Sequence, residues 1–148
     1  MGRRVKAFFD TSAVVPLFVE SHVHRGRAAP WFERVRTGEV RGILPLHSAA
    51  EAYRTLSTYP VVPRIEVPVL RAALHLLLDG PFEVVTPEAD DYRAVITFLA
   101  DREIRGRVVY DALLIQAARK SGADVILTFN DRDFRRVAPD LADRIRTP

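Results

Sequence analysis

Short apolar runs alternate with longer amphipathic segments along the whole chain. The apolar runs have the length of β-strands and lie at residues 5–9, 42–46, 82–86 and 123–129. Segments with helical periodicity lie between them, at residues 12–20, 24–37, 47–59, 69–80, 87–104 and 108–122. Alternation of this kind predicts βαβ units. We therefore expect an α/β fold with a central parallel sheet of four to five strands and helices on both faces.

Residues that start or stop helices fall at the ends of these segments. Pro87 suits a first helical turn, and Gly122 suits the position just after a helix. A cluster of prolines at 60, 63 and 68 predicts a loop between two helices rather than a domain boundary. A chain of 148 residues with 48% hydrophobic residues can build one core. We expect a single domain over residues 1–148.

Composition excludes some classes of function. The sequence has no cysteine, so disulfide and thiolate chemistry are unavailable. No segment approaches the roughly 18 uninterrupted apolar residues of a membrane span, and the N-terminal apolar run stops at Asp10, too early for a signal peptide. We therefore expect a cytoplasmic protein without membrane contact. Of its 22 basic residues only Lys6 and Lys120 are lysine; arginine suits phosphate binding, but genome composition explains such a bias equally well.

Carboxylates recur where the predicted strands end and the following helices begin. Asp10 follows the first strand, Glu51 and Asp111 lie near the starts of two helices, and Asp131 and Asp133 follow the last strand. In open α/β sheets the carboxyl ends of the strands form the ligand-binding edge, and the crossover helices begin at that same edge. Segments far apart in the chain are thus expected to send acids to one place.

Each acid also has a purely structural interpretation. Asp10 and Asp111 can cap helices. Ser48 and Glu51 have the spacing of a capping box. The last two aspartates can belong to a solvated turn with neighbouring arginines. Taken together, however, clustered carboxylates repel one another unless a cation is present.

A hard divalent cation fits this set of acids. Mg²⁺ and Mn²⁺ prefer oxygen ligands, and the sequence lacks a Cys or His cluster suited to zinc. The histidines are expected to be solvated or to flank helices, and they are His22, His24, His47 and His75. An acidic cluster with Mg²⁺ is typical of phosphoryl hydrolysis by an activated water, without a covalent intermediate.

Three stretches resemble the motifs of one family in the same order. They are "FFDTSA" at 8–13, "AEAYRTL" at 50–56 and "YDALLIQAARKSGADVILTFNDRDF" at 110–134. The sequence resembles the PIN-domain ribonucleases over nearly its whole length, and particularly the VapC-like toxins of bacterial toxin–antitoxin pairs. The resemblance implies a PIN-like fold and a Mg²⁺- or Mn²⁺-dependent endoribonuclease. Carried over by position, it implies that the metal-binding catalytic acids are Asp10, Glu51, Asp111 and Asp133.

The resemblance also implies supporting residues around these acids. Ser12 and Asn130 match polar residues that support the acids, and Thr128 matches the residue that ends the last strand. Asp131 and Asp133 both qualify as the fourth acid. We favour Asp133, because the family motif places its acid immediately before the phenylalanine.

Partners follow from the same resemblance. It implies single-stranded or looped RNA as substrate, a cognate antitoxin whose tail lies across the active-site groove, and a homodimer. Arginines near the predicted groove are candidates for contacts with RNA phosphates, or are ordinary loop charges. They are Arg102, Arg105, Arg107 and Arg132, with Arg135 and Arg136 beside them.

Three other functions compete with this interpretation. A phosphoacceptor receiver domain needs a lysine at a strand end, whereas Lys6 begins a strand and Lys120 lies late in a helix. A phosphatase with an aspartate nucleophile carries a second aspartate where this chain has Ser12. A PIN-fold scaffold that binds RNA or protein without cutting is the more serious alternative, although it has no need of mutually repelling carboxylates.

Overall fold

Five parallel strands form the central sheet of the computed structural model, which describes residues 2–148. The strands are β1 (Lys6–Phe9), β2 (Arg41–Pro45), β3 (Glu83–Val85), β4 (Val125–Leu127) and β5 (Ile145–Arg146). Their order in the sheet is β3-β2-β1-β4-β5, and every neighbouring pair is parallel. The α/β fold with a parallel sheet, expected from the alternating pattern, is confirmed.

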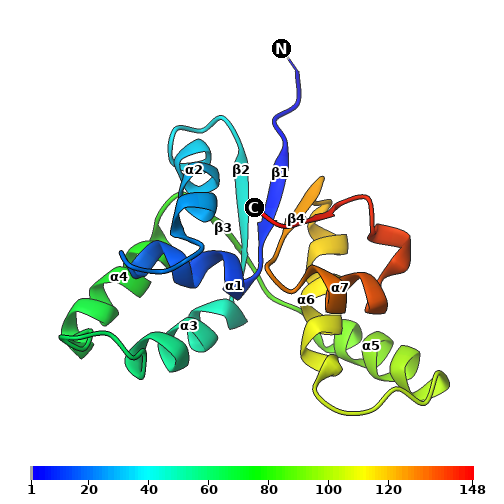
Figure 1. Ribbon diagram of the computed structural model, residues 1–148. Coiled ribbons are helices and arrows are strands. Elements are labelled where there is room, and N and C mark those ends of the chain that lie inside the picture. Colours follow the sequence, from blue (N-terminus) through cyan, green and yellow to red (C-terminus); the bar gives the residue numbers. More distant parts are fainter. Residues whose placement is uncertain (1) are drawn as a thin grey trace.

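Helices cover both faces of this sheet. They are α1 (Thr11–Val14), α2 (Arg25–Arg36), α3 (His47–Ser57), α4 (Val67–Asp79), α5 (Ala89–Asp101), α6 (Val108–Ser121) and α7 (Asp131–Val137), with 3₁₀ turns at Val15–Phe18 and Pro139–Leu141. Figure 1 shows α1 to α4 on one side of the sheet and α5 to α7 on the other. Among the helices of residues 2–148, none has both the length and the apolar character that crossing a membrane requires.

The alternation of side chains along the strands builds two cores. Ala7 and Phe9 of β1 pack with the first group of helices, whereas Phe8 between them packs with the second. In β2, Leu44 joins the first core and Ile43 the second. Because successive side chains of a strand point to opposite faces, apolar runs such as these are buried on both sides.

Two glycines are required by the packing and the backbone. A Cβ atom on Gly42 of β2 would lie 2.6 Å from the Val35 side chain and 2.7 Å from the Phe82 ring, so α2 packs closely on this strand. Gly122 ends α6 in a left-handed conformation with φ of 67°, as predicted from its position.

The structure corrects the sequence-based elements in two places. The helix expected at 12–20 is α1 followed by a 3₁₀ turn that ends at Phe18, because Pro16 has no N–H to continue an α-helix. After β4, the chain forms α7 from Asp131 and then the short strand β5. Two residues carry no periodic signal, so β5 is defined only by its pairing with β4.

Candidate active site

A cavity of about 650 Å³ lies at the carboxyl end of the sheet, the end away from the N-terminus in Figure 1. We call it the acid cavity, because the side chains that line it include Asp10, Glu51, Asp111 and Asp133. Asp10 follows β1 directly, and the other three lie near the starts of α3, α6 and α7. The structure thus brings the four predicted acids to one place, from segments separated by up to 123 positions.

Asp10 is held by hydroxyl groups from two segments. Its side chain is buried, and its Oδ2 atom accepts hydrogen bonds of 2.8 Å from both Ser12 Oγ and Thr128 Oγ1. Ser12 Oγ in turn accepts a bond of 2.9 Å from the backbone N–H of Phe129, and Thr128 Oγ1 accepts one of 2.9 Å from that of Asn130. Asp10 precedes α1 but makes no capping bond through its side chain, so its carboxylate is oriented by this network.

The electrostatics of the acid cavity disfavour the charged state of its aspartates. Burial raises the pKa of Asp10, against the lowering effect of the Ser12 and Thr128 hydroxyls. The pKa of Asp111 rises to about 6, first because of burial and then because of repulsion from the other three acids. Arg107 lowers the pKa of Asp111 without cancelling these effects.

The capping interpretation of Ser48 and Glu51 is wrong. Ser48 lies inside α3 rather than at its cap, and its buried hydroxyl accepts a hydrogen bond of 2.9 Å from Thr11 Oγ1. Glu51 lies in the acid cavity, where its Oε1 is 3.0 Å from His47 Nε2. Glu51 therefore lines the cavity and contacts the His47 side chain, but it does not form a capping box with Ser48.

Asp131 and Asp133 lie in the first turn of α7 but have different surroundings. Asp133 lines the acid cavity and contributes to the raised pKa of Asp111. Asp131 forms an ion pair with Arg135 on the same helix, and in the described chain it is not among the residues lining the cavity. This placement favours Asp133 as the fourth acid.

The four acids line one cavity, but their side chains are not arranged as a complete set of metal ligands. Within residues 2–148, no group of three or more His, Asp and Glu side chains is arranged so that it would hold a metal ion. Glu51 lies against His47, and the hydroxyls of Ser12 and Thr128 occupy one oxygen of Asp10. The donor chemistry, carboxylate oxygens that repel one another, nevertheless matches a hard divalent cation. Side-chain rotations would have to complete the ligand set.

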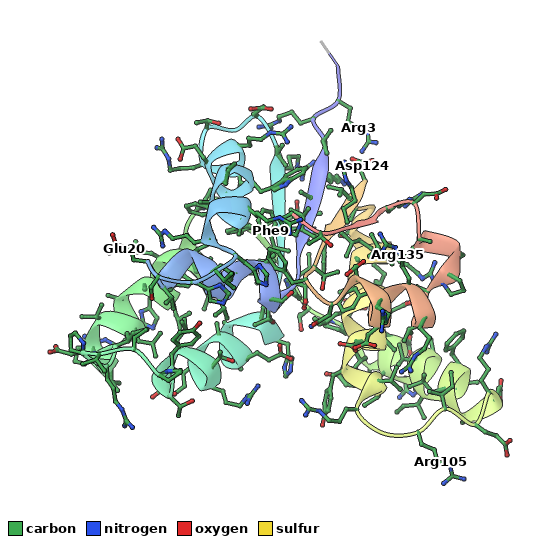
Figure 2. All side chains as sticks on the ribbon, viewed as in Figure 1. Arg3, Phe9, Glu20, Arg105, Asp124 and Arg135 are labelled. Carbon is green, nitrogen blue, oxygen red and sulfur yellow. The ribbon has the colours of Figure 1, made fainter. Side chains whose placement is uncertain are left out.

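Arginines rim the acid cavity, though only some of those expected. Arg105 and Arg107 line it, and Figure 2 shows Arg105 on the loop that connects α5 to α6. Arg102 instead lies over the Phe98 ring, 3.8 Å from its centroid. In the described chain, neither Arg102 nor Arg132 is among the residues that line the cavity. Arg136, another of the candidates, lines it as well, and so does Arg54, which was not expected.

Sequence reasoning missed an aromatic wall of the acid cavity. His22 and His24, expected to be solvated or to flank helices, line the cavity together with Phe129, and His24 directly precedes α2. The His24 ring stacks on the Phe129 ring at 3.9 Å, and the His22 and His24 rings are 5.5 Å apart. The i, i+2 spacing of the histidines gave no signal of this wall, because Phe129 comes from the distant end of the chain. His47 begins α3 and is 52% exposed, as expected of a solvated or helix-flanking histidine, and it also contacts Glu51 and stacks near Tyr110.

Comparison with known families identifies the class of protein. The family model described as "PIN domain" matches residues 7–139, which include all four acids and nearly all of strands β1 to β4, but not β5. The chain therefore belongs to the PIN domain family, and the receiver-domain and phosphatase interpretations are set aside. A search of curated proteins found no match to this sequence.

A solved structure places the fold more narrowly. The chain is similar to VapC20 of Mycobacterium tuberculosis, a toxin described as cleaving the sarcin–ricin loop. The TM-score is 0.62 at 21% sequence identity, over 81% of this chain and 86% of the other. Membership of the PIN domain family is thus confirmed, and the fold is similar to that of a VapC toxin.

Proposed function

We propose that this protein is a metal-dependent endoribonuclease and the toxin component of a toxin–antitoxin pair. The observation that carries the proposal is the convergence of four carboxylates in one arginine-rimmed cavity at the carboxyl end of a PIN-type sheet. The fold alone does not define an activity. The acids and the arginines supply the chemical argument.

The residues present fit Mg²⁺ or Mn²⁺. Asp10, Glu51, Asp111 and Asp133 would hold the ion. The pKa of Asp111 is raised to about 6 by burial first and then by repulsion from the other acids, and a cation would relieve that repulsion. When bound, such an ion supplies positive charge for the phosphate oxygens and lowers the pKa of a water molecule.

The chain's own residues orient the reacting groups. Ser12 and Thr128 fix the carboxylate of Asp10 through the shared Oδ2 atom, so that it is preorganised at the end of β1. Arg54, Arg105, Arg107 and Arg136 surround the acids and would contact RNA phosphates on either side of the cleaved bond. The arginines also offset the repulsion between the acids and the RNA backbone.

Substrate, partners and location belong to the same proposal. VapC20 is described as a toxin that cleaves an RNA loop, and we extend only the class of substrate, exposed single-stranded or looped RNA, to this chain. A cognate antitoxin that covers the acid cavity and a homodimer are part of the proposal, and the similarity of the fold to a VapC toxin supports them. A ribonuclease toxin meets its substrate in the cytoplasm, where we place it.

A non-cleaving scaffold is disfavoured by the energetics of the cavity. Burial and mutual repulsion raise the pKa values of Asp10 and Asp111, so keeping these acids together costs stability at neutral pH. A binding surface for RNA would gain from replacing them with neutral residues. A cation-dependent reaction requires them.

The test is cleavage of total RNA and of a transfer-RNA pool by the purified protein, in Mg²⁺, Mn²⁺ or EDTA. Asp10→Asn and Asp111→Asn are the test variants, and Asp124→Asn, at the opposite end of the sheet, is the matched control. We expect discrete fragments that require metal, are absent with both test variants and persist with the control. RNA binding without cleavage in any metal would overturn the proposal and favour the scaffold.

A further inference from the structure

A second cavity of about 350 Å³ adjoins the acid cavity. It lies between the start of α3, the connection from β3 to α5, and helices α5 and α6. We call it the aromatic cavity, because Tyr92 and Tyr110 line it. Tyr110 and Leu114 line both cavities, which therefore adjoin along α6.

The aromatic cavity differs from the acid cavity in charge. Its other walls are Pro45, Leu46, Ala50, Pro87 and Leu113 with a few polar neighbours. Among the described residues that line it, none is Asp, Glu, Lys or Arg. The neighbouring acid cavity, by contrast, is lined by both acidic and arginine side chains.

Flat rings stand exposed at the boundary between the two cavities. Tyr110 is 51% exposed and immediately precedes Asp111, and Tyr92 is 47% exposed. The His47 ring lies parallel to that of Tyr110, with 6.2 Å between ring centroids and 6° between planes. Single-stranded RNA binders use exposed aromatic rings of this kind to stack bases.

The paired cavities match the two halves of a nucleotide. A nucleotide joins a charged phosphate to a flat, uncharged base, and here an arginine-rimmed acid cavity adjoins an uncharged aromatic one. We propose that the aromatic cavity binds an unpaired nucleobase next to the cleaved phosphate, with Tyr110 as the shared wall. This inference rests on the proposed ribonuclease function and extends it to the recognition of the base.

The position of the aromatic cavity next to the acid cavity favours a nucleobase over a protein side chain as its occupant. A phosphate held by the acid cavity carries its base on the same backbone, so the base reaches an adjoining cavity without any further segment. An apolar side chain from a second copy of this chain would also fit an uncharged cavity. The experiment below therefore includes the mass of the protein in solution.

The experiment compares short RNA substrates that contain the cleaved bond and carry either a base or an abasic ribose at each flanking position. The variants are Tyr92→Ala and Tyr110→Ala, with the Phe replacements at both positions to retain the rings. Tyr53→Ala is the control, because Tyr53 is 46% exposed on α3 and is not among the described residues that line either cavity. The readouts are kcat/KM, binding of the same RNAs to Asp10→Asn protein, and mass by light scattering.

We expect removal of one flanking base to lower kcat/KM by about tenfold for the wild type and for the Tyr53→Ala and Phe variants. The two Ala variants should cut the intact RNA about as slowly as the wild type cuts the abasic RNA, and should show no further loss on the abasic RNA. This non-additive pattern would place the base against these rings.

Three other results would overturn the inference in distinguishable ways. If the wild type cuts intact and abasic RNA equally fast, or if the Ala variants still lose activity when the base is removed, the proposed base site is contradicted. Neither result would contradict the proposed nuclease activity. A change from dimer to monomer in the Ala variants would assign the cavity to a second copy. Failure of the wild type to cut or bind any RNA would overturn the proposed function and this inference with it.

Discussion

Asp91 and Asp111 lie in the first turns of consecutive helices, α5 and α6, and yet their pKa values move in opposite directions. The pKa of Asp91 falls to about 2, because Lys120, the backbone of Glu88 and Gln116 all donate hydrogen bonds to its carboxylate. The pKa of Asp111 rises to about 6, because burial and three neighbouring acids oppose its charge. A helix start favours both carboxylates, so the neighbours decide the difference.

The comparison shows which carboxylates the chain neutralises by itself. Lys120 Nζ lies 2.8 Å from Asp91, and Arg3 lies 2.7 Å from Asp124 at the amino end of the sheet, beside which it is labelled in Figure 2. The pKa of Asp124 is lowered by that arginine. At the carboxyl end, the arginines rim the acids but leave the pKa of Asp111 raised. This difference agrees with the proposed binding of a cation at the carboxyl end.

The largest expected effect is a difference in the rate of RNA cleavage between substitutions at the two ends of the sheet. Asp10→Asn should lower the rate of RNA cleavage by about a thousandfold, since it removes a proposed ligand of an ion that would supply several kcal/mol of charge stabilisation. Asp124→Asn removes an equivalent charge at the other end and should leave the rate within about twofold of the wild type. Initial rates on one RNA substrate measure both. Equal losses in the two variants would mean that the carboxyl end has no special role.

The next effect is on stability at Asp91. Asp91→Ala should lower Tm by roughly 3–6 °C, because Lys120 and Gln116 lose their shared partner. Asp90→Ala is the matched control, since Asp90 is 92% exposed and pairs only with Arg93 on the surface, so its Tm should hardly change. Thermal unfolding followed by circular dichroism tests both, and similar losses would show that Asp91 is an ordinary surface charge.

The same pair predicts a pH dependence. Because the pKa of Asp91 is lowered from 3.8 to about 2 on folding, its stabilisation is complete above about pH 4 and disappears as the pH falls to about 2. In Asp91→Asn protein, the loss of stability over that interval should be smaller. Denaturant midpoints measured across it would contradict the ion pair if wild type and variant declined in parallel.

A smaller effect of opposite sign is expected at Asp111. Its raised pKa means that folding becomes less favourable as the pH rises from 3.8 through about 6. In EDTA at pH 7, Asp111→Asn should therefore raise Tm by roughly 2–4 °C, whereas below about pH 4 the variant and the wild type should agree. A variant that is less stable in EDTA at pH 7 would show that the acids do not repel one another.

The smallest expected effect concerns the arginine rim. Arg136→Ala should weaken RNA binding a few-fold and reduce the slope of log affinity against log salt by about one. Arg102→Ala is the control, because Arg102 covers the Phe98 ring outside the described lining of the cavity. Filter binding at several salt concentrations, with Asp10→Asn protein as the background, measures the slopes. Equal changes of the salt slope in the two variants would show that the arginines act only through the general positive charge of the protein.

Much of the fold follows from local pattern. Phe8 and Phe9 are adjacent, buried and on opposite faces, which is why a short apolar run predicts a strand of a doubly covered sheet. The gathering of Asp10 and Asp111 also follows, because the topology of parallel sheets fixes where strands end and helices begin. The resemblance to a family supplied the choice of Asp133.

The remaining features depend on contacts between distant segments. The two residues of β5 become a strand only by pairing with β4, and Phe129 becomes a cavity wall only by stacking on His24. Ser48 was expected to cap a helix, but its hydroxyl instead accepts a hydrogen bond inside the fold from Thr11, which lies 37 positions earlier. No local window of sequence contains these partners.

The central claim is that the acids of the carboxyl end require an external cation, and Mn²⁺ binding measured by isothermal titration calorimetry tests it without RNA. At pH 7, the account predicts saturable binding to the wild type and to Asp91→Asn, and its loss in Asp10→Asn and Asp111→Asn. Binding that survives in both cavity variants, or no binding by the folded wild type at millimolar Mn²⁺, would contradict the account.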